Sequence, residues 1–468
     1  MLAALFPACG GRSLDDRRDA AAADATIEIQ CPGSSGLGPP TWVRSYQRGY
    51  AYDVAVLSTG QIALGGSTSG VQDYGGGPLT AGLKAAPLFV LLDADGRHLA
   101  SRLLDTYGYT YPGDTRAAIA PALAGHAWLG VGGVGPQDFG TGVVPAGPDS
   151  SGLFLLDVDP TGAMRVVRHF SGAPVSELSG PSIIDLASDG AGGVSMSGFA
   201  PGLDLGTGAG PGNVIARMSP DGTLSMSRVG LTGYATLATK DGGLVAVVPF
   251  SKTVDLGLGP LTSRGGMDFA VVRLDATGAT RWARAIGGRD DELATGLAVD
   301  ARDHVWVGAM QLSTEVDLGD GLRSVGTEPD GGGLFELSPT GQVLGVTRPP
   351  GLEPPPNERA YVNFSTVHLL GGGDVLVGGY FHTSIRLGRY VLRKGVNDFQ
   401  IFLARRTPEG NFKWARCIRA GEINLLGDAQ ETADGQLIVA GGGDAAVDFG
   451  DGPMAETGPG MFVTKLPQ

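Results

Sequence analysis

Tyrosine is the residue type with the most uneven distribution along this chain of 468 residues. Six of its eleven tyrosines fall in two short segments, at positions Tyr46, Tyr50, Tyr52, Tyr107, Tyr109 and Tyr111. Aromatic rings offer contact area at a low cost in entropy, and aromatic loops on a rigid scaffold commonly recognise ligands. We therefore predict one patch that binds a glycan or a protein loop, with ordinary loop packing as the alternative.

The remaining reactive residues show no spacing that is typical of catalysis or metal binding. The six histidines lack the paired spacing of a zinc site, and neither a Gly-x-Ser-x-Gly nor a phosphate-loop motif is present. The net charge is −14 without a basic stripe, so nucleic acid is not an expected partner. No apolar run reaches transmembrane length. We expect no catalytic residue, no cofactor and no metal.

An arginine marks each of seven repeats, in short strand-like segments that follow a turn. The set is Arg44, Arg102, Arg168, Arg228, Arg284, Arg348 and Arg416. Sevenfold repetition is typical of a structural part, whereas an active site needs different groups that converge on one point. We expect salt bridges or stem packing from these arginines rather than catalysis.

A second recurring motif, Asp-x-Gly, follows the second strand of most repeats with a period of about 62 residues. It is present at Asp73, Asp138, Asp204, Asp255, Asp317 and Asp448. The spacing predicts an aspartate that caps its own turn, with glycine supplying the unusual backbone angle. Calcium ligation is the alternative, but hard cations need several oxygens at one place.

The fourth repeat shows the expected unit most clearly. Strands are predicted over residues 234–239, 244–248, 269–274 and 280–284, with a longer connection over residues 255–266. Seven such units predict an all-β fold, a seven-bladed β-propeller with four antiparallel strands per blade. The body begins with a fourth-type strand at 42–46 and ends with a third-type strand at 462–466, so we expect the N-terminal strand to join the last blade.

Residues 282–292, followed by the strand of residues 305–308, form a motif that resembles the bacterial β-propeller-repeat (SBBP-type) family of secreted and surface lipoproteins. The resemblance covers about residues 41–468. It implies a propeller fold and an exported location, and it brings no common catalytic residues.

The N-terminus resembles the end of a bacterial lipoprotein signal, with Ala8 before a Cys9 that would be lipidated. No basic region precedes it, and Phe6 stands where the family has leucine; a chance cysteine is the alternative. We predict a lipoprotein-type signal remnant over residues 1–9, a flexible tether over residues 10–40 and one propeller domain over residues 41–468.

If Cys9 is lipidated, Cys31 and Cys417 remain as a possible disulfide, which suits an exported protein. Cys31 lies just before the closing strand, and Cys417 lies on the outer strand of the sixth repeat. Such a bond would lock the ring and stabilise it by about 5–6 kcal/mol in the chain-entropy account. Two free thiols are the alternative.

From these observations we expect a non-catalytic, lipid-anchored module that binds or scaffolds an unknown protein or glycan at the outer membrane or cell surface. A monomer is expected, held to the membrane by the anchor alone. Two alternatives remain, a purely structural envelope protein and an enzyme. The enzyme alternative rests on residues 275–282, which resemble the blade signature of quinone-dependent dehydrogenases.

Overall fold

The protein has an all-β, propeller-like fold, as the sequence predicts. The computed structural model describes residues 25–81, 85–104, 117–145, 150–174, 181–199, 202, 213–231, 233–325, 331–352, 361–395, 399–419, 421, 424–450, 452–453 and 460–468. Within these ranges every regular element is a β-strand, apart from the short 3-10 turns Leu123–Gly125 and Gly371–Gly373. No helix in the described ranges is long and apolar enough to cross a membrane.

Each repeat is built on a set of four antiparallel strands, and among the described residues seven sheets contain such a set. The four strands follow one another in chain order, except that sheet 7 takes its outer strand, β3, from the start of the body. Sheet 6 gains β2 (Gly33–Ser34) as a fifth strand, and sheet 4 is extended to six by β26 (Glu315–Asp317) and β27 (Leu322–Ser324). Sheet 1 holds β4 (Tyr50–Val56), β5 (Ile62–Thr68), β8 (Ala86–Leu92) and β9 (His98–Leu103). Sheet 2 holds β10 (Ala118–Pro121), β11 (Ala127–Val134), β14 (Ser150–Val158) and β15 (Met164–Pro174), and sheet 3 holds β16 (Ser182–Ser188), β17 (Val194–Phe199), β18 (Asn213–Met218) and β19 (Leu224–Val229).

The other four sheets repeat this order. Sheet 4 holds β20 (Ala235–Ala238), β21 (Leu244–Asp255), β22 (Pro260–Leu274) and β23 (Thr280–Gly288). Sheet 5 holds β24 (Leu293–Val299), β25 (Val305–Gln311), β28 (Gly333–Leu337) and β29 (Val343–Thr347). Sheet 6 holds β31 (Thr366–Leu369), β32 (Val375–Phe381), β35 (Gln400–Arg406) and β36 (Phe412–Ile418), and sheet 7 holds β37 (Asn424–Glu431), β38 (Leu437–Gly443), β39 (Gly460–Leu466) and β3 (Trp42–Tyr46).

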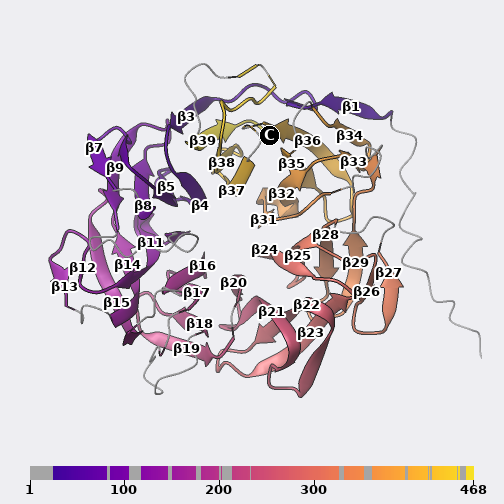
Figure 1. Cartoon of the computed structure of the whole chain (residues 1–468), viewed down its shortest axis with the longest axis horizontal. Coiled ribbons are helices and arrows are strands. Elements are labelled where there is room, and N and C mark those ends of the chain that lie inside the picture. The colour runs from indigo at the N-terminus through magenta and orange to yellow at the C-terminus, as the bar shows by residue number, and fades with distance from the viewer. Residues whose placement is uncertain are drawn as a thin grey trace, which may run out of the picture.

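The hydrophobic core lies between neighbouring sheets. Phe89 of sheet 1 packs in one cluster with Leu129 of sheet 2, and Val54 of sheet 1 packs in another with Ile438 of sheet 7. The two middle strands of sheet 1 are buried at every position, because they are covered on both faces. Figure 1 shows the sheets placed around a common centre, with the first strand of each nearest to it.

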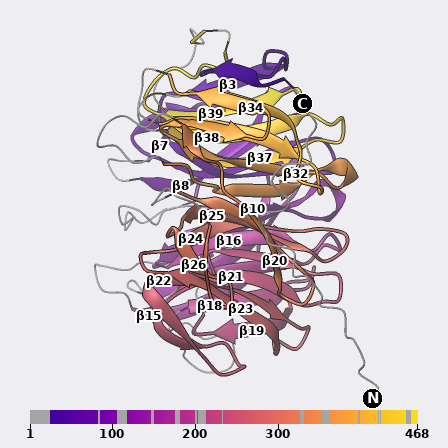
Figure 2. The same ribbon diagram turned by 90° about the vertical axis from the view of Figure 1, so that its right-hand side faces the viewer.

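The first strands touch from sheet to sheet around this centre. β4 contacts β10, β10 contacts β16, and the series continues through β20, β24, β31 and β37 back to β4. The first strand of the body, β3, pairs antiparallel with β39, from Trp42 opposite Lys465 to Tyr46 opposite Met461. Figure 2 shows β3 beside β39 in a second direction.

Three of the recurring arginines reach from their own sheet to the next one, through backbone carbonyls rather than carboxylates. Arg44 donates from Nε to the carbonyl oxygen of Gly96 at 2.7 Å, Arg284 does the same to Gly341 at 2.9 Å, and Arg228 donates to Gly278. A Cβ on Gly341 would lie 2.6 Å from the ring of Trp282, so only glycine lets the ring pack on this turn. These three arginines therefore join neighbouring sheets.

The Asp-x-Gly motifs are turns closed by their own aspartate. Asp255 Oδ1 accepts hydrogen bonds from the backbone N–H groups of Gly257 at 2.7 Å and Gly259 at 3.2 Å. Asp73, Asp317 and Asp448 make the same pair of bonds. No group of three or more potential metal ligands occurs among the residues that the structure describes.

The long connection predicted over residues 255–266 is a continuation of two strands. β21 runs to Asp255 and β22 starts at Pro260, with Thr253 opposite Thr262 beyond a bulge at residues 251–253. β-branched residues favour this extended pairing although the hairpin projects beyond the core. The hairpin forms one wall of a cleft described below.

The structure differs from the prediction of a flexible tether over residues 10–40. β1 (Ile27–Gln30) pairs parallel with β34 (Tyr390–Arg393), and β2 (Gly33–Ser34) pairs with β36. Alternation at Ile27 and Ile29 suits a strand, and Ile29 is buried against sheet 6. Residues 1–24, which include Cys9, lie outside the described residues.

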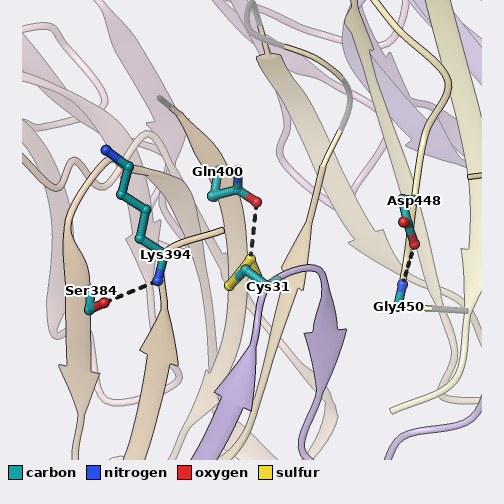
Figure 3. The surroundings of a disulfide bond; sticks show 7 residues. Cys31, Ser384, Lys394, Gln400, Asp448 and Gly450 are labelled. Atoms are coloured by element: carbon teal, nitrogen blue, oxygen red, sulfur yellow. Dashed lines mark hydrogen bonds between the residues drawn. A yellow bond between two sulfur atoms is a disulfide. The ribbon is translucent and has the colours of Figure 1, made fainter. Parts of the chain in front are cut away.

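Cys31 and Cys417 are joined by a disulfide across 386 residues, with a Cα–Cα distance of 5.4 Å. Cys31 follows β1 directly, and Cys417 lies on β36 opposite Gly33. Figure 3 shows the bond beside Gln400, whose side-chain oxygen lies 3.8 Å from the Cys417 sulfur. The first described residues are thereby fixed to sheet 6.

Candidate active site in the central channel

The centre of the molecule holds a cavity of about 480 Å³ to which the first strand of every sheet, or its flanking residues, contributes. Most of the lining is aliphatic or small. Five ionisable residues are the exceptions. Asp53, Asp185, His368 and Asp428 line the cavity, as does Glu431, whose carboxylate accepts from the backbone N–H of Gly371 and from Gln468. They come from sheets 1, 3, 6 and 7, so four distant parts of the chain meet here.

A local irregularity precedes each of the three aspartates. The pairing register shifts between Ala51 and Asp53, between Ile183 and Asp185, and between Leu426 and Asp428. A β-bulge inserts an extra residue and changes the face to which the following side chain points. The bulges account for carboxyl groups that line the channel in strands that are otherwise apolar.

Asp53 bridges two neighbouring strands and is the most perturbed of the acids. Its Oδ2 accepts the backbone N–H of Ile119 in β10 at 2.8 Å. Burial raises the pKa of Asp53 well above its ordinary value, and the nearby charges of Asp428 and Asp185 raise it further. Solvent in the channel can reach the carboxyl, but protein surrounds it, and this favours its protonated form more than in an exposed aspartate.

Asp185 makes the corresponding bridge from sheet 3 to sheet 4. Its Oδ2 accepts the backbone N–H of Thr236 at 2.6 Å and the Thr236 hydroxyl at 3.0 Å. Burial raises the pKa of Asp185 to about 6, while these two hydrogen bonds oppose the rise. A carboxyl with this pKa is ionised at neutral pH and still has useful basicity.

His368 and Asp428 form a pair between sheets 6 and 7, with 2.5 Å between His368 Nε2 and Asp428 Oδ1. Burial lowers the pKa of His368, but the charge and hydrogen bond of Asp428, with a contribution from Asp185, outweigh it. The net result is a raised pKa, so the imidazolium persists to higher pH than usual. The channel therefore holds two aspartates with raised pKa values and a histidine–aspartate pair.

Sequence reasoning missed these four residues, although a signal was present. Asp53, Asp185 and Asp428 occupy the same place in the first strand of repeats one, three and seven, where the other repeats have no acid. An ionisable residue in a strand that should be buried indicates function when only some repeats carry it. The alternative is that the acids simply bridge strands, as Asp53 and Asp185 do.

The predicted tyrosine patch is not formed as expected. Tyr46 is only 9% exposed, and its ring packs 4.8 Å from that of Tyr74. Burial raises the pKa of Tyr46 to about 12. Tyr46 is buried because its strand β3 completes sheet 7 and carries the side chain into the core between sheets 7 and 1.

The other predicted tyrosines separate into two groups. Tyr50 and Tyr52 have ring centres 6.4 Å apart, and Tyr52 lines the central cavity. Tyr107, Tyr109 and Tyr111 lie outside the described residues.

Residues 275–282, which suggested a quinone-dependent enzyme, lie at the rim rather than at the channel. Asp275 caps its own turn by accepting from the backbone N–H of Thr277, and Trp282 donates to the carbonyl oxygen of Pro339 in the next sheet at 2.9 Å. This motif therefore supports packing between sheets and brings nothing to a cofactor site.

No family model matches this chain, and no curated protein sequence matches it. Among solved structures, an α-L-arabinanase from Penicillium chrysogenum in complex with arabinobiose is 11% identical, with a TM-score of 0.38, and the match covers 92% of this chain and 99% of that one. A gluconolactonase from Xanthomonas campestris is 11% identical, with a TM-score of 0.32, and the match covers 74% and 91%. A puromycin hydrolase is 14% identical, with a TM-score of 0.32, and the match covers 84% and 58%.

These three structures are all enzymes, which runs against the prediction of a non-catalytic binding or scaffolding module. That prediction is not carried forward, and its alternative, a propeller enzyme, is taken up below as a proposal. At these identities and TM-scores no activity or residue role is transferred from them to this chain. The chain is thus an all-β protein with a propeller-like fold and an ionisable cluster at its centre.

Proposed function

We propose that this protein is an enzyme whose central channel hydrolyses a carbon–oxygen bond by general acid–base catalysis. The observation that carries the proposal is the meeting of Asp53, Asp185 and the His368–Asp428 pair in one cavity, with the pKa values of the two bridging acids raised. Sites whose ionisable groups are shifted by burial and by each other are typical of active centres.

Each group has a proposed role in this reaction. Asp53, whose pKa is raised by burial, is the general acid that donates a proton to the leaving oxygen. Asp185 is ionised and takes a proton from the attacking water. The protonated imidazole of His368, held by Asp428, stabilises the negative charge that develops on the reacting oxygen atoms. The net reaction adds one water molecule across the carbon–oxygen bond that breaks.

The test is hydrolysis of chromogenic glycosides, esters and lactones by the wild type and by Asp53→Asn and Asp185→Asn. We expect kcat/KM to fall by about 100-fold or more in each variant, the usual effect of losing a general acid or base. The wild type should show a bell-shaped pH profile. The matched control is Asp73→Asn, which removes a carboxylate at the rim.

A purely structural role for these acids gives the opposite pattern. If Asp53 and Asp185 only bridge strands, their variants lose stability and keep the rate of the folded fraction. Equal rates per folded molecule, or no turnover of any of the three substrate classes, would contradict the proposal.

We further propose that the sheets form a closed seven-bladed ring and that the protein is an exported lipoprotein of the SBBP-type family, anchored through Cys9. The return of strand contacts from β37 to β4 and the pairing of β3 with β39 support closure. The Cys31–Cys417 disulfide supports an oxidising compartment. Mass spectrometry of the mature N-terminus in its native host tests the anchor.

A further inference from the structure

A second cavity, of about 600 Å³, lies at the rim between two hairpins. One wall is the extended part of β22, from Pro260 to Arg264. The opposite wall is the turn that follows β26 (Glu315–Asp317), and the floor is the small-residue stretch of β23 that includes Ala283 and Ala285. The cleft therefore does not involve the channel.

One buried polar atom at this cleft has no partner among the described residues. Asp268 lines the cleft and is 1% exposed. Its Oδ2 accepts the backbone N–H of Arg264 at 3.0 Å, but its Oδ1 accepts no hydrogen bond from any described donor. A buried acceptor without a donor costs free energy, and a ligand that supplies the donor recovers it.

Glu292, which is fully buried, lies behind Asp268 and is already saturated with donors. Its Oε1 accepts the backbone N–H of Ser313 at 2.8 Å and the Ser313 hydroxyl, and its Oε2 accepts the backbone N–H of Gly288 at 2.6 Å. Burial raises the pKa of Asp268 to about 6, and the charge and hydrogen bond of Glu292 act in the same direction. Both effects favour the protonated form of Asp268 below a pH of about 6.

The carboxylates at the cleft outnumber its guanidinium groups by one. The acids are Asp268, Asp317 and, behind the cleft, Glu292. The bases are Arg264, which pairs with Asp317 and also acts on Asp268, and Arg284, which donates to carbonyl oxygens and keeps its charge. When Asp268 and Glu292 are both ionised, the cleft therefore carries an excess negative charge.

We propose that this cleft binds a primary ammonium group, such as that of an alkylamine or a lysine side chain, which donates to Asp268 Oδ1. An ammonium group supplies both the missing donor and the missing charge. A calcium ion fits less well, because the Glu292 oxygens are occupied by three donors and hard cations need six or more oxygens. Below the pKa of Asp268, binding displaces its proton to solvent.

The test is ligand-observed NMR titration of the intact protein with propylammonium chloride, with 1-propanol as the neutral probe of equal size. We expect saturable binding of propylammonium at pH 7.5 that is about tenfold weaker at pH 5, where Asp268 keeps its proton. Asp268→Asn should weaken binding about tenfold or more. Glu315→Gln, which removes an exposed carboxylate on the neighbouring hairpin, should leave binding unchanged.

Three results would overturn the proposal: 1-propanol binding as tightly as the amine, Asp268→Asn binding like the wild type, or no saturable binding at pH 7.5. If Asp268→Asn does not fold, calorimetry of the wild type at about pH 5.5, in two buffers of different ionisation enthalpy, decides, because Asp268 is then still mostly protonated before binding. Proton release on binding supports the proposal, and its absence contradicts it.

Discussion

Arg284 donates from Nε to the carbonyl oxygen of Gly341, 2.9 Å away, and so crosses the boundary between sheet 4 and sheet 5. Its Nη1 also lies 3.3 Å from the carbonyl oxygen of Gly319, in the turn of the β26–β27 hairpin, which pairs with the end of β23. One guanidinium group thus donates to the carbonyl oxygens of two turns whose backbone conformation favours glycine. The relation recurs between Arg44 and Gly96, which shows that the repeat encodes its own contact with the next repeat.

Replacing Arg284 by alanine should lower the free energy of unfolding by about 1.5–3 kcal/mol, the usual range for a hydrogen bond to a charged group. The control is Arg281→Ala on the same strand, because Arg281 is exposed and makes a surface ion pair with Asp275. That pair should contribute less than about 1 kcal/mol. Urea unfolding measures both, and equal effects would contradict the structural role of Arg284.

Removing the disulfide should destabilise the protein substantially. In the chain-entropy account a loop of 386 residues corresponds to about 5–6 kcal/mol, as an upper value. We expect the double variant Cys31→Ser, Cys417→Ser to unfold at lower denaturant concentration, and reductant to shift only the wild type. Two free thiols at positions 31 and 417 in the native, non-reduced protein would contradict the bond.

Stability should fall as pH rises from about 4 to 7, because of the channel acids. Folding raises the pKa of Asp185 from 3.8 to about 6, so its contribution is present below pH 4 and is lost as pH rises through 6. The raised pKa of Asp53 acts in the same sense. Denaturant midpoints against pH measure this slope, and Asp185→Asn should flatten it between pH 4 and 6.

The pair of His368 and Asp428 gives a separate titration that NMR can follow. Burial alone lowers the pKa of His368, and Asp428 reverses this effect. Replacing Asp428 by asparagine should therefore move the pKa of His368 from above its ordinary value of 6.5 to below it. Asp317→Asn, at the rim, is the control that should leave the His368 titration in place. An unchanged pKa in Asp428→Asn would contradict the pairing.

The repeat pattern predicts the sheets well because each one is built from local hairpins whose signals lie within about 60 residues. Residues 244–248 were expected as a strand and lie in β21, and residues 269–274 were expected as a strand and lie in β22. The extension of this hairpin to residues 255 and 260 was missed, because its exposed, polar pairing leaves no hydrophobic alternation to detect.

The candidate site was not predicted, for a different physical reason. The aspartates that line the channel point there because of bulges after Ala51, Ile183 and Leu426, and a bulge has no sequence signature of its own. The prediction that Tyr46 lies in an exposed patch was also wrong. Its strand was correctly expected, but its ring enters the core between sheets 7 and 1 instead of an exposed loop.

The attachment of β1 and Cys31 to sheet 6 has a mechanical consequence. Tension applied to the chain ahead of residue 27 first shears the parallel pairing of β1 with β34 and then meets the covalent link to Cys417. The load therefore passes into sheet 6, and the β3–β39 seam that follows along the chain is shielded from it. A molecule pulled from its N-terminal end can stay folded at the place where its two chain ends meet.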